Sequence, residues 1–125
     1  MTEAPPRNFE VEFYRLPSGE KPVALFLDSL DIKMRAKALS GLDILADYGN
    51  TLRAPYSKAM SDGVFELRIA FGGDISRIFY FFFVDRKIVL TNGFVKKTQR
   101  TPTREIELAR KYKADYERRE RHERP

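Results

Sequence analysis

The chain has 125 residues and a formal net charge of +5, and this length fits a single domain spanning residues 1–125. It has no cysteine, which excludes a disulfide framework and a thiolate metal site. Its longest apolar block, residues 78–84, is shorter than the roughly 18 apolar residues of a membrane span, and the start of the chain lacks the pattern of a signal peptide, so we expect a cytoplasmic protein.

The first half of the chain predicts a strand followed by two helices. Apolar and polar residues alternate over residues 9–15, as in a half-buried strand. Pro22 favours a helix start, and apolar residues recur at helical spacing over residues 23–30. Asp31 is a good cap for a second helix, which we expect to end at Gly49. The two helices should form an antiparallel hairpin.

The second half predicts three antiparallel strands. After a polar loop over residues 50–63, the apolar period changes from helical to two, which indicates a strand over residues 64–71. Gly72-Gly73 is a strong two-residue hairpin signal, and the next strand covers residues 74–84. A turn at Asp85-Arg86 would lead into a third strand over residues 87–95.

A helix starting at Thr101 or Thr103 should complete the chain, and we expect the charged residues 118–125 to be a frayed or disordered tail. The predicted order is strand, two helices, three antiparallel strands, helix. This order defines an α+β domain with one small sheet packed on the helical hairpin.

The hairpin fixes which residues face each other. If Phe71 faces Asp74, then Arg68 lies directly opposite Arg77 on the same face of the sheet. Like charges in that position cost stability, and a sequence that accepts the cost favours two guanidinium groups directed at one anion. The alternative is that Glu66, on the same strand and face, neutralises one arginine.

Pairing through the second turn extends this face onto the third strand. Phe94 would then face Arg77, with Lys96 just beyond it, so that Arg68, Arg77 and Lys96 converge at one end of the sheet. The same face carries Phe79, Phe81 and Phe83, so the central strand should be covered on both sides, either by the last helix, by a partner protein, or by both.

The positive charge is concentrated in the sequence. Residues 68–100 hold seven Lys or Arg and two acids, while the rest of the chain is neutral. A concentrated basic patch favours a polyanion such as nucleic acid, and the alternative is a solvated surface with a chance imbalance.

The remaining residue types limit the chemistry. His122 is the one histidine, and no cluster of His, Cys, Asp and Glu suits a metal, so we expect neither a metal nor another cofactor. Lysines and arginines suffice for RNA cleavage by the 2′-hydroxyl of the substrate itself. Arginines stabilise the phosphate, and a lysine beside other cations loses its proton more readily, which makes Lys96 or Lys97 the candidate base.

Several segments resemble the RelE/ParE superfamily, and most closely its phage-derived HigB-like branch. The resemblance covers roughly residues 9–115, and its most specific part is the stretch Lys96-Lys97-Thr98-Gln99-Arg100-Thr101-Pro102. The other matching segments are Phe65-Glu66-Leu67-Arg68-Ile69, Arg77-Ile78-Phe79-Tyr80 and Gly93-Phe94-Val95. Leu16-Pro17-Ser18-Gly19, Phe26-Leu27-Asp28-Ser29-Leu30 and Ser57-Lys58 also fit.

The resemblance implies a RelE-like fold and the toxin of a type II toxin–antitoxin system. Such a toxin is an endoribonuclease (mRNA interferase) that inhibits translation, usually on the ribosome, and its antitoxin is commonly a helix-turn-helix DNA-binding protein. By this match the catalytic residues are Arg68, Arg77 and Lys96, and the RNA-binding residues are Lys58, Lys97 and Arg100. Arg53, in the same polar loop as Lys58, is a further candidate for RNA binding.

The resemblance leaves proton transfer open. Some members use a tyrosine near the C-terminal end of the site, but this chain has none there. Tyr80 is a substitute candidate, although its register directs it towards the core.

Three other functions remain open from the sequence: a ParE-like inhibitor of DNA gyrase, a nucleic-acid-binding module without catalysis, and a protein-interaction domain. We expect Arg77→Ala to abolish toxicity with the fold intact.

Overall fold

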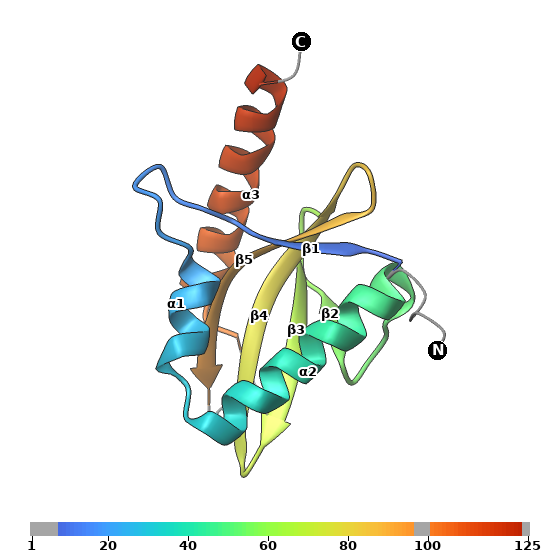
Figure 1. Ribbon diagram of the computed structural model, residues 1–125, viewed down its shortest axis with the longest axis vertical. Coiled ribbons are helices and arrows are strands. Elements are labelled where there is room, and N and C mark those ends of the chain that lie inside the picture. The colour runs from blue at the N-terminus through green and yellow to red at the C-terminus, as the bar shows by residue number, and fades with distance from the viewer. Residues whose placement is uncertain (1–7, 97–100, 124–125) are drawn as a thin grey trace, which may run out of the picture.

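The structure, a computed structural model, describes residues 8–96 and 101–123, except for the side chains of Lys96, His122 and Glu123. A five-stranded sheet lies between two helical layers (Figure 1). In chain order the elements are β1 (Glu10–Phe13), α1 (Pro22–Ser29), α2 (Ile32–Tyr48), a 3-10 helix (Gly49–Thr51), β2 (Ser57–Ala59), β3 (Phe65–Phe71), β4 (Asp74–Phe83), β5 (Lys87–Lys96) and α3 (Thr103–Glu123).

The α+β class and the helix boundaries in the first half agree with the sequence predictions. Helix α1 begins at Pro22, and the side chain of Asp31 caps α2 by accepting a hydrogen bond of 2.8 Å from the backbone N–H of Met34. Gly49 ends α2 with φ of 49°, a conformation that glycine adopts without the steric cost of a side chain.

The sheet has the order β1-β5-β4-β3-β2, with β1 parallel to β5 and the other neighbours antiparallel. The prediction of an uninterrupted loop over residues 50–63 is wrong, because β2 lies within it and pairs with β3. A strand as short as Ser57–Ala59 holds too few residues to show an alternating pattern, so the sequence gives no signal for it.

Both predicted registers at the arginines are confirmed. Arg68 pairs with Arg77, and Arg77 pairs with Phe94. The second register arises in an unexpected way: Phe83 rather than Val84 pairs with Lys87, and an irregularity between Ile78 and Tyr80 shifts the pairing back by one residue. The longer turn and the bulge cancel each other.

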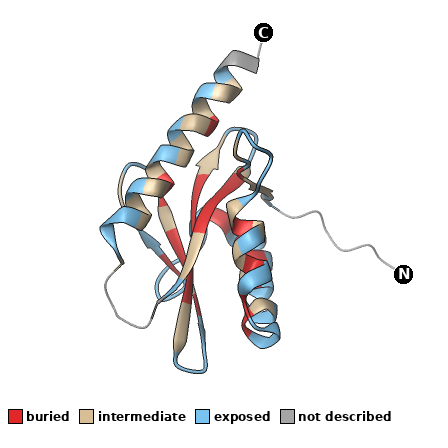
Figure 2. Cartoon of the chain, turned by 90° about the vertical axis from the view of Figure 1, so that its left-hand side faces the viewer, coloured by how far each residue is buried: buried red, intermediate tan, exposed pale blue. Residues whose placement is uncertain are grey.

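Helices cover both faces of the sheet, as Figure 2 shows. Helices α1 and α2 pack on one face, in a core that includes Leu67, Ile78 and Tyr80. Helix α3 covers the other face and contacts Phe79 and Phe81. Helix α3 therefore buries the second apolar face of β4, which the sequence predicted to be covered on both sides. None of the described helices is both long and apolar enough to cross a membrane.

Helix α3 continues to Glu123, so the prediction of a frayed tail is wrong for residues 118–123, while residues 124–125 lie outside the described residues. Asp115 forms ion pairs with Arg118 and Arg119, and Lys113 with Glu117, all within one helical turn. The helix projects past the sheet in Figure 1. Ion pairs at this spacing stabilise a helix, so a run of charged residues can be helical although its composition is typical of a frayed tail.

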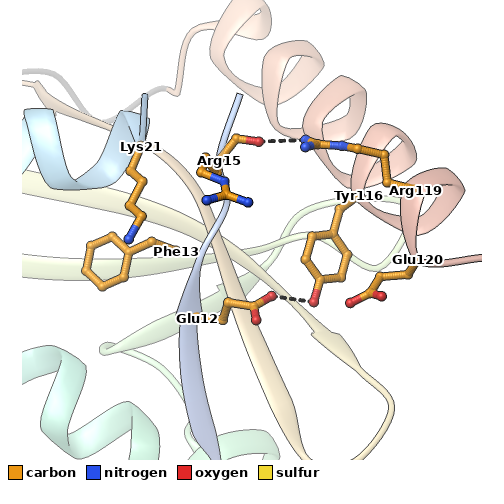
Figure 3. Close-up of a pocket in the computed structure, with 7 residues that line it drawn as sticks. All are labelled: Glu12, Phe13, Arg15, Lys21, Tyr116, Arg119 and Glu120. Atoms are coloured by element: carbon orange, nitrogen blue, oxygen red, sulfur yellow. Dashed lines mark hydrogen bonds between the residues drawn. The ribbon is translucent and has the colours of Figure 1, made fainter. Parts of the chain in front are cut away.

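The second half of α3 is clamped to β1 and the following loop. Tyr14 donates a hydrogen bond of 2.6 Å to Asp115, Tyr116 donates one to Glu12, and Arg119 donates one of 2.6 Å to the backbone oxygen of Arg15. The last two bonds border a polar pocket of about 320 Å³ (Figure 3). These contacts hold α3 over the sheet.

The clamp predicts a loss of stability at high pH. Burial of the ring, together with the bond to Asp115, raises the pKa of Tyr14 from 10.0 to about 12. The folded state therefore retains the phenol proton that the unfolded chain loses, so this contribution is complete below pH 10.0 and disappears as the pH rises towards about 12. Tyr80, Tyr112 and Tyr116, whose pKa values are also raised, add to the same fall in stability. Urea denaturation should therefore show a fall over this range of which Tyr14→Phe removes about 2 kcal/mol. Equal pH dependence in the two proteins would contradict this role of Tyr14.

Candidate functional site

A buried carboxylate joins the two strand arginines. Glu66 is 0% exposed and Arg77 is 1% exposed, and their Oε1 and Nη1 atoms lie 2.5 Å apart. The second carboxylate oxygen, Oε2, accepts a hydrogen bond of 2.7 Å from the hydroxyl of Thr101. Arg68 approaches the same carboxylate at 3.5 Å through Nε, and its side chain is 27% exposed.

This arrangement corrects the expectation that both guanidinium groups face one anion in solvent. Glu66 neutralises Arg77, which is the alternative that the sequence leaves open, and Arg77 is buried. Arg68 is the one of the two that solvent reaches. Because Arg77 already pairs closely with the carboxylate, the charge of Arg68 is only weakly compensated.

Part of the Arg77 guanidinium has no partner. Its Nε and Nη2 atoms are buried and make no hydrogen bond within the described part of the chain. A buried donor without an acceptor costs free energy, so an anion that reached these atoms would be bound favourably. The covering atoms would first have to move away.

The local fold explains why these side chains meet. Glu66 and Arg68 alternate along β3 and so point to one face, and Arg68 and Arg77 are cross-strand partners on that face. Glu66 pairs with Phe79, so it lies diagonally from Arg77. An arginine side chain is long enough to span this diagonal.

Lys58 belongs to the same region. It lies on β2 opposite Glu66, which places it on the arginine face, and it is exposed. Arg53 is also exposed, but its guanidinium is held by its own loop, since it donates to the backbone oxygens of Asn50 (2.7 Å) and Leu52 (3.2 Å). The structure thus brings Lys58, but not the guanidinium of Arg53, to the site.

The candidate residues at the end of β5 are only partly described. The backbone of Lys96 pairs with Ile75, two rows along the sheet from the pair of Arg77 and Phe94. Lys97 and Arg100 lie outside the described residues. Phe94 packs in the core beneath α3, with its ring 5.8 Å from that of Phe79.

The positive charge is less concentrated in space than in sequence. Arg86 and Lys87 lie at the opposite end of β4 and β5 from Arg77 and Lys96, roughly 25–30 Å away along the strands. There Arg86 stacks over the ring of Phe9 at 4.5 Å, and the Lys87 ammonium lies 4.0 Å from Glu12. The expectation of one basic patch from residues 68–100 therefore holds only for part of these cations.

Tyr80 lies on the opposite face of the sheet from the arginines. Its hydroxyl shares a hydrogen bond of 2.5 Å with Ser57, and its ring stacks on that of Phe65 in the α1–α2 core. Burial raises the pKa of Tyr80. It is therefore unsuited to proton transfer at Arg68.

The structure adds one residue that sequence reasoning misses, Thr101. It lies just before α3, and its hydroxyl reaches Glu66 across the sheet. The sequence around Thr101 predicts the start of a helix at Pro102 and Thr103. It does not predict that the hydroxyl of Thr101 contacts Glu66. In the part of the chain that the structure describes, no three His, Cys, Asp or Glu side chains gather as a metal site would require.

The fold and this face define a small, basic α+β protein with a partly exposed arginine beside a buried ion pair. Residues 25–114 match a protein family described as phage-derived protein Gp49-like (DUF891), and the chain belongs to this family. The family is part of the RelE/ParE-like toxin superfamily, whose members are generally toxins of toxin–antitoxin pairs, which implies a cognate antitoxin. No curated protein matches the chain.

Proposed function

We propose that this protein is the toxin of a type II toxin–antitoxin pair of the HigB-like branch, and that it is a cytoplasmic endoribonuclease that cleaves mRNA on the ribosome. Its antitoxin would be a helix-turn-helix DNA-binding protein. The observation that carries the proposal is the partly exposed guanidinium of Arg68 beside the buried pair of Arg77 and Glu66. A gyrase inhibitor has no need of a phosphate-binding arginine.

The two arginines have different tasks in this proposal. Arg68 binds the scissile phosphate, because solvent reaches it and its fork of N–H donors matches two phosphate oxygens. Arg77 keeps Glu66 in place, so the carboxylate holds Arg68 at 3.5 Å without fully neutralising it. Lys58 then binds the RNA backbone, and Lys97 and Arg100 extend this contact along the RNA. Arg53 would join them only after releasing the backbone oxygens of Asn50 and Leu52.

Cleavage proceeds by attack of the RNA 2′-oxygen on the adjacent phosphorus, with release of the 5′-oxygen of the next nucleotide. The new P–O bond replaces the P–O5′ bond, the 2′-hydroxyl proton passes to a base, and the leaving oxygen takes up a proton. Lys96 or Lys97 is our candidate for this base. Arg68 stabilises the charge that develops on the phosphate oxygens, and the protein holds the attack in line.

The chemistry of the RNA ends tests this mechanism. Translating ribosomes, incubated with the purified protein, should yield mRNA fragments with a 2′,3′-cyclic phosphate at one end and a 5′-hydroxyl at the other. Fragments with a 3′-hydroxyl and a 5′-phosphate would show that water is the nucleophile and would contradict the proposal. In bacteria that express the protein, growth arrest with intact mRNA would favour gyrase as the target instead.

A further inference from the structure

A groove of about 410 Å³ runs along the free edge of β3, between the flank of α2 and the segment that precedes β2. Its walls are mainly apolar, and they include the residues Ile44 and Tyr56, which are 41% and 57% exposed. Two charged residues line it, Lys37 and Arg68, and both are cations.

The backbone of β3 has unused hydrogen-bonding groups in this groove. The pairing of β2 with β3 ends where the N–H of Arg68 donates to the oxygen of Tyr56. Alternate residues of an antiparallel strand direct their backbone groups to the same side, so Ala70 points its N–H and C=O outward as Arg68 does. Strand β4 pairs with Ala70 on one side, and in the described part of the chain no strand runs along its other, outward side; Ala70 is exposed.

We propose that this groove binds an extended segment of a partner protein as an added strand beside Ala70. Side chains of an added strand alternate between the two faces of the sheet. On one face they would meet the apolar surface of Ile44 and Ile69, and on the other they would meet Arg68. The segment is therefore apolar at every second position and acidic between, because both charged lining residues are positive.

This inference rests on the proposed function for the identity of the partner, which is then the antitoxin. A carboxylate of its segment would occupy the guanidinium of Arg68 that otherwise binds the scissile phosphate. One arginine would thus serve both RNA and antitoxin, and binding of the segment would exclude RNA directly. RNA itself has no use for the apolar wall or for the strand edge.

A peptide probe tests the groove independently of toxicity. We would add a capped peptide of alternating valine and aspartate to the ¹⁵N-labelled full chain and follow the amide signals by NMR, with a valine–lysine peptide as the charge control. The acidic peptide should shift the signals of Ala70 and its neighbours, and the lysine peptide should not. Equal shifts with both peptides, or shifts confined to other elements, would overturn the proposal.

Substitutions at the groove wall provide the matched comparison. Ile44→Asp should weaken binding of the acidic peptide by roughly tenfold or more, because the added strand would bury a carboxylate on the apolar side. Ile32→Asp, at a position that is 79% exposed at the start of α2, should leave binding unchanged. Tyr56→Ser is a second groove variant in case Ile44→Asp unfolds. Equal affinity of the wild type and a folded groove variant would overturn the proposal.

Coexpression with the antitoxin separates this inference from the proposed function. Ile44→Asp should still arrest growth and cleave mRNA, but the antitoxin should no longer neutralise it. Normal neutralisation of that variant would place the antitoxin elsewhere and overturn the inference, with the toxin function intact. If the wild type neither arrests growth nor cleaves mRNA, the proposed function fails, and the peptide experiment still decides whether the groove binds an acidic strand.

Discussion

Arg77→Ala should lower the free energy of unfolding by about 3–5 kcal/mol, because it leaves Glu66 as a buried charge without its partner. Glu66 is 0% exposed, and after the substitution its remaining close contact is the hydroxyl of Thr101, with Arg68 at 3.5 Å. A small domain is stable by only about 5–15 kcal/mol, so the change is a large fraction of the total. Urea denaturation measures it. The structure thereby replaces the expectation that Arg77→Ala would leave the fold intact.

Two comparisons separate the ion pair from a general effect of losing an arginine. Arg118→Ala removes an arginine whose side chain is 62% exposed, and it should change stability by no more than about 0.5 kcal/mol. The double variant Arg77→Met/Glu66→Leu should recover much of the loss, because it removes both buried charges. If Arg77→Ala were as stable as the wild type, the buried pair would not hold this face together.

Arg68→Ala should lower the rate of mRNA cleavage by about 10²–10³-fold, the usual effect of removing one donor that stabilises transition-state charge. Its side chain is 27% exposed and lies 3.5 Å from Glu66, so its loss should cost no more than about 1 kcal/mol of stability. Cleavage on translating ribosomes and urea denaturation of the same preparations measure the two effects separately.

Arg68→Lys provides the conservative variant. It keeps the charge but loses the planar fork that binds two phosphate oxygens, so its activity should lie between those of the wild type and Arg68→Ala. Cleavage by Arg68→Ala at the wild-type rate would remove Arg68 from the catalytic residues.

Local signals in the sequence were sufficient for much of the fold. Gly72-Gly73 defines a two-residue turn, and the turn fixes the register that places Arg68 opposite Arg77. The helix starts at Pro22 and Asp31 depend on residues within one turn of each boundary. Strand β2 could not be predicted, because a three-residue edge strand is defined by its pairing with β3 and hardly by its own pattern.

The burial of the side chains at the site could not be predicted from local signals. Alternation along β3 gives the face on which Glu66 and Arg68 lie, but not what covers that face. The burial of Arg77 follows from contacts distant in sequence, with α3 packed on this face and Thr101 bonded to Glu66 from 35 positions away. The choice between two solvent-facing arginines and one neutralised arginine therefore required the three-dimensional structure.

Mapping of mRNA 5′-ends in bacteria that express the wild type, Arg68→Ala or Arg118→Ala tests the central claim most directly. We predict new cuts within translated frames for the wild type and for Arg118→Ala, and their loss in Arg68→Ala at equal protein abundance. The same cuts in all three strains, or growth arrest by the wild type without any cut, would contradict the assignment of this face as a ribonuclease site.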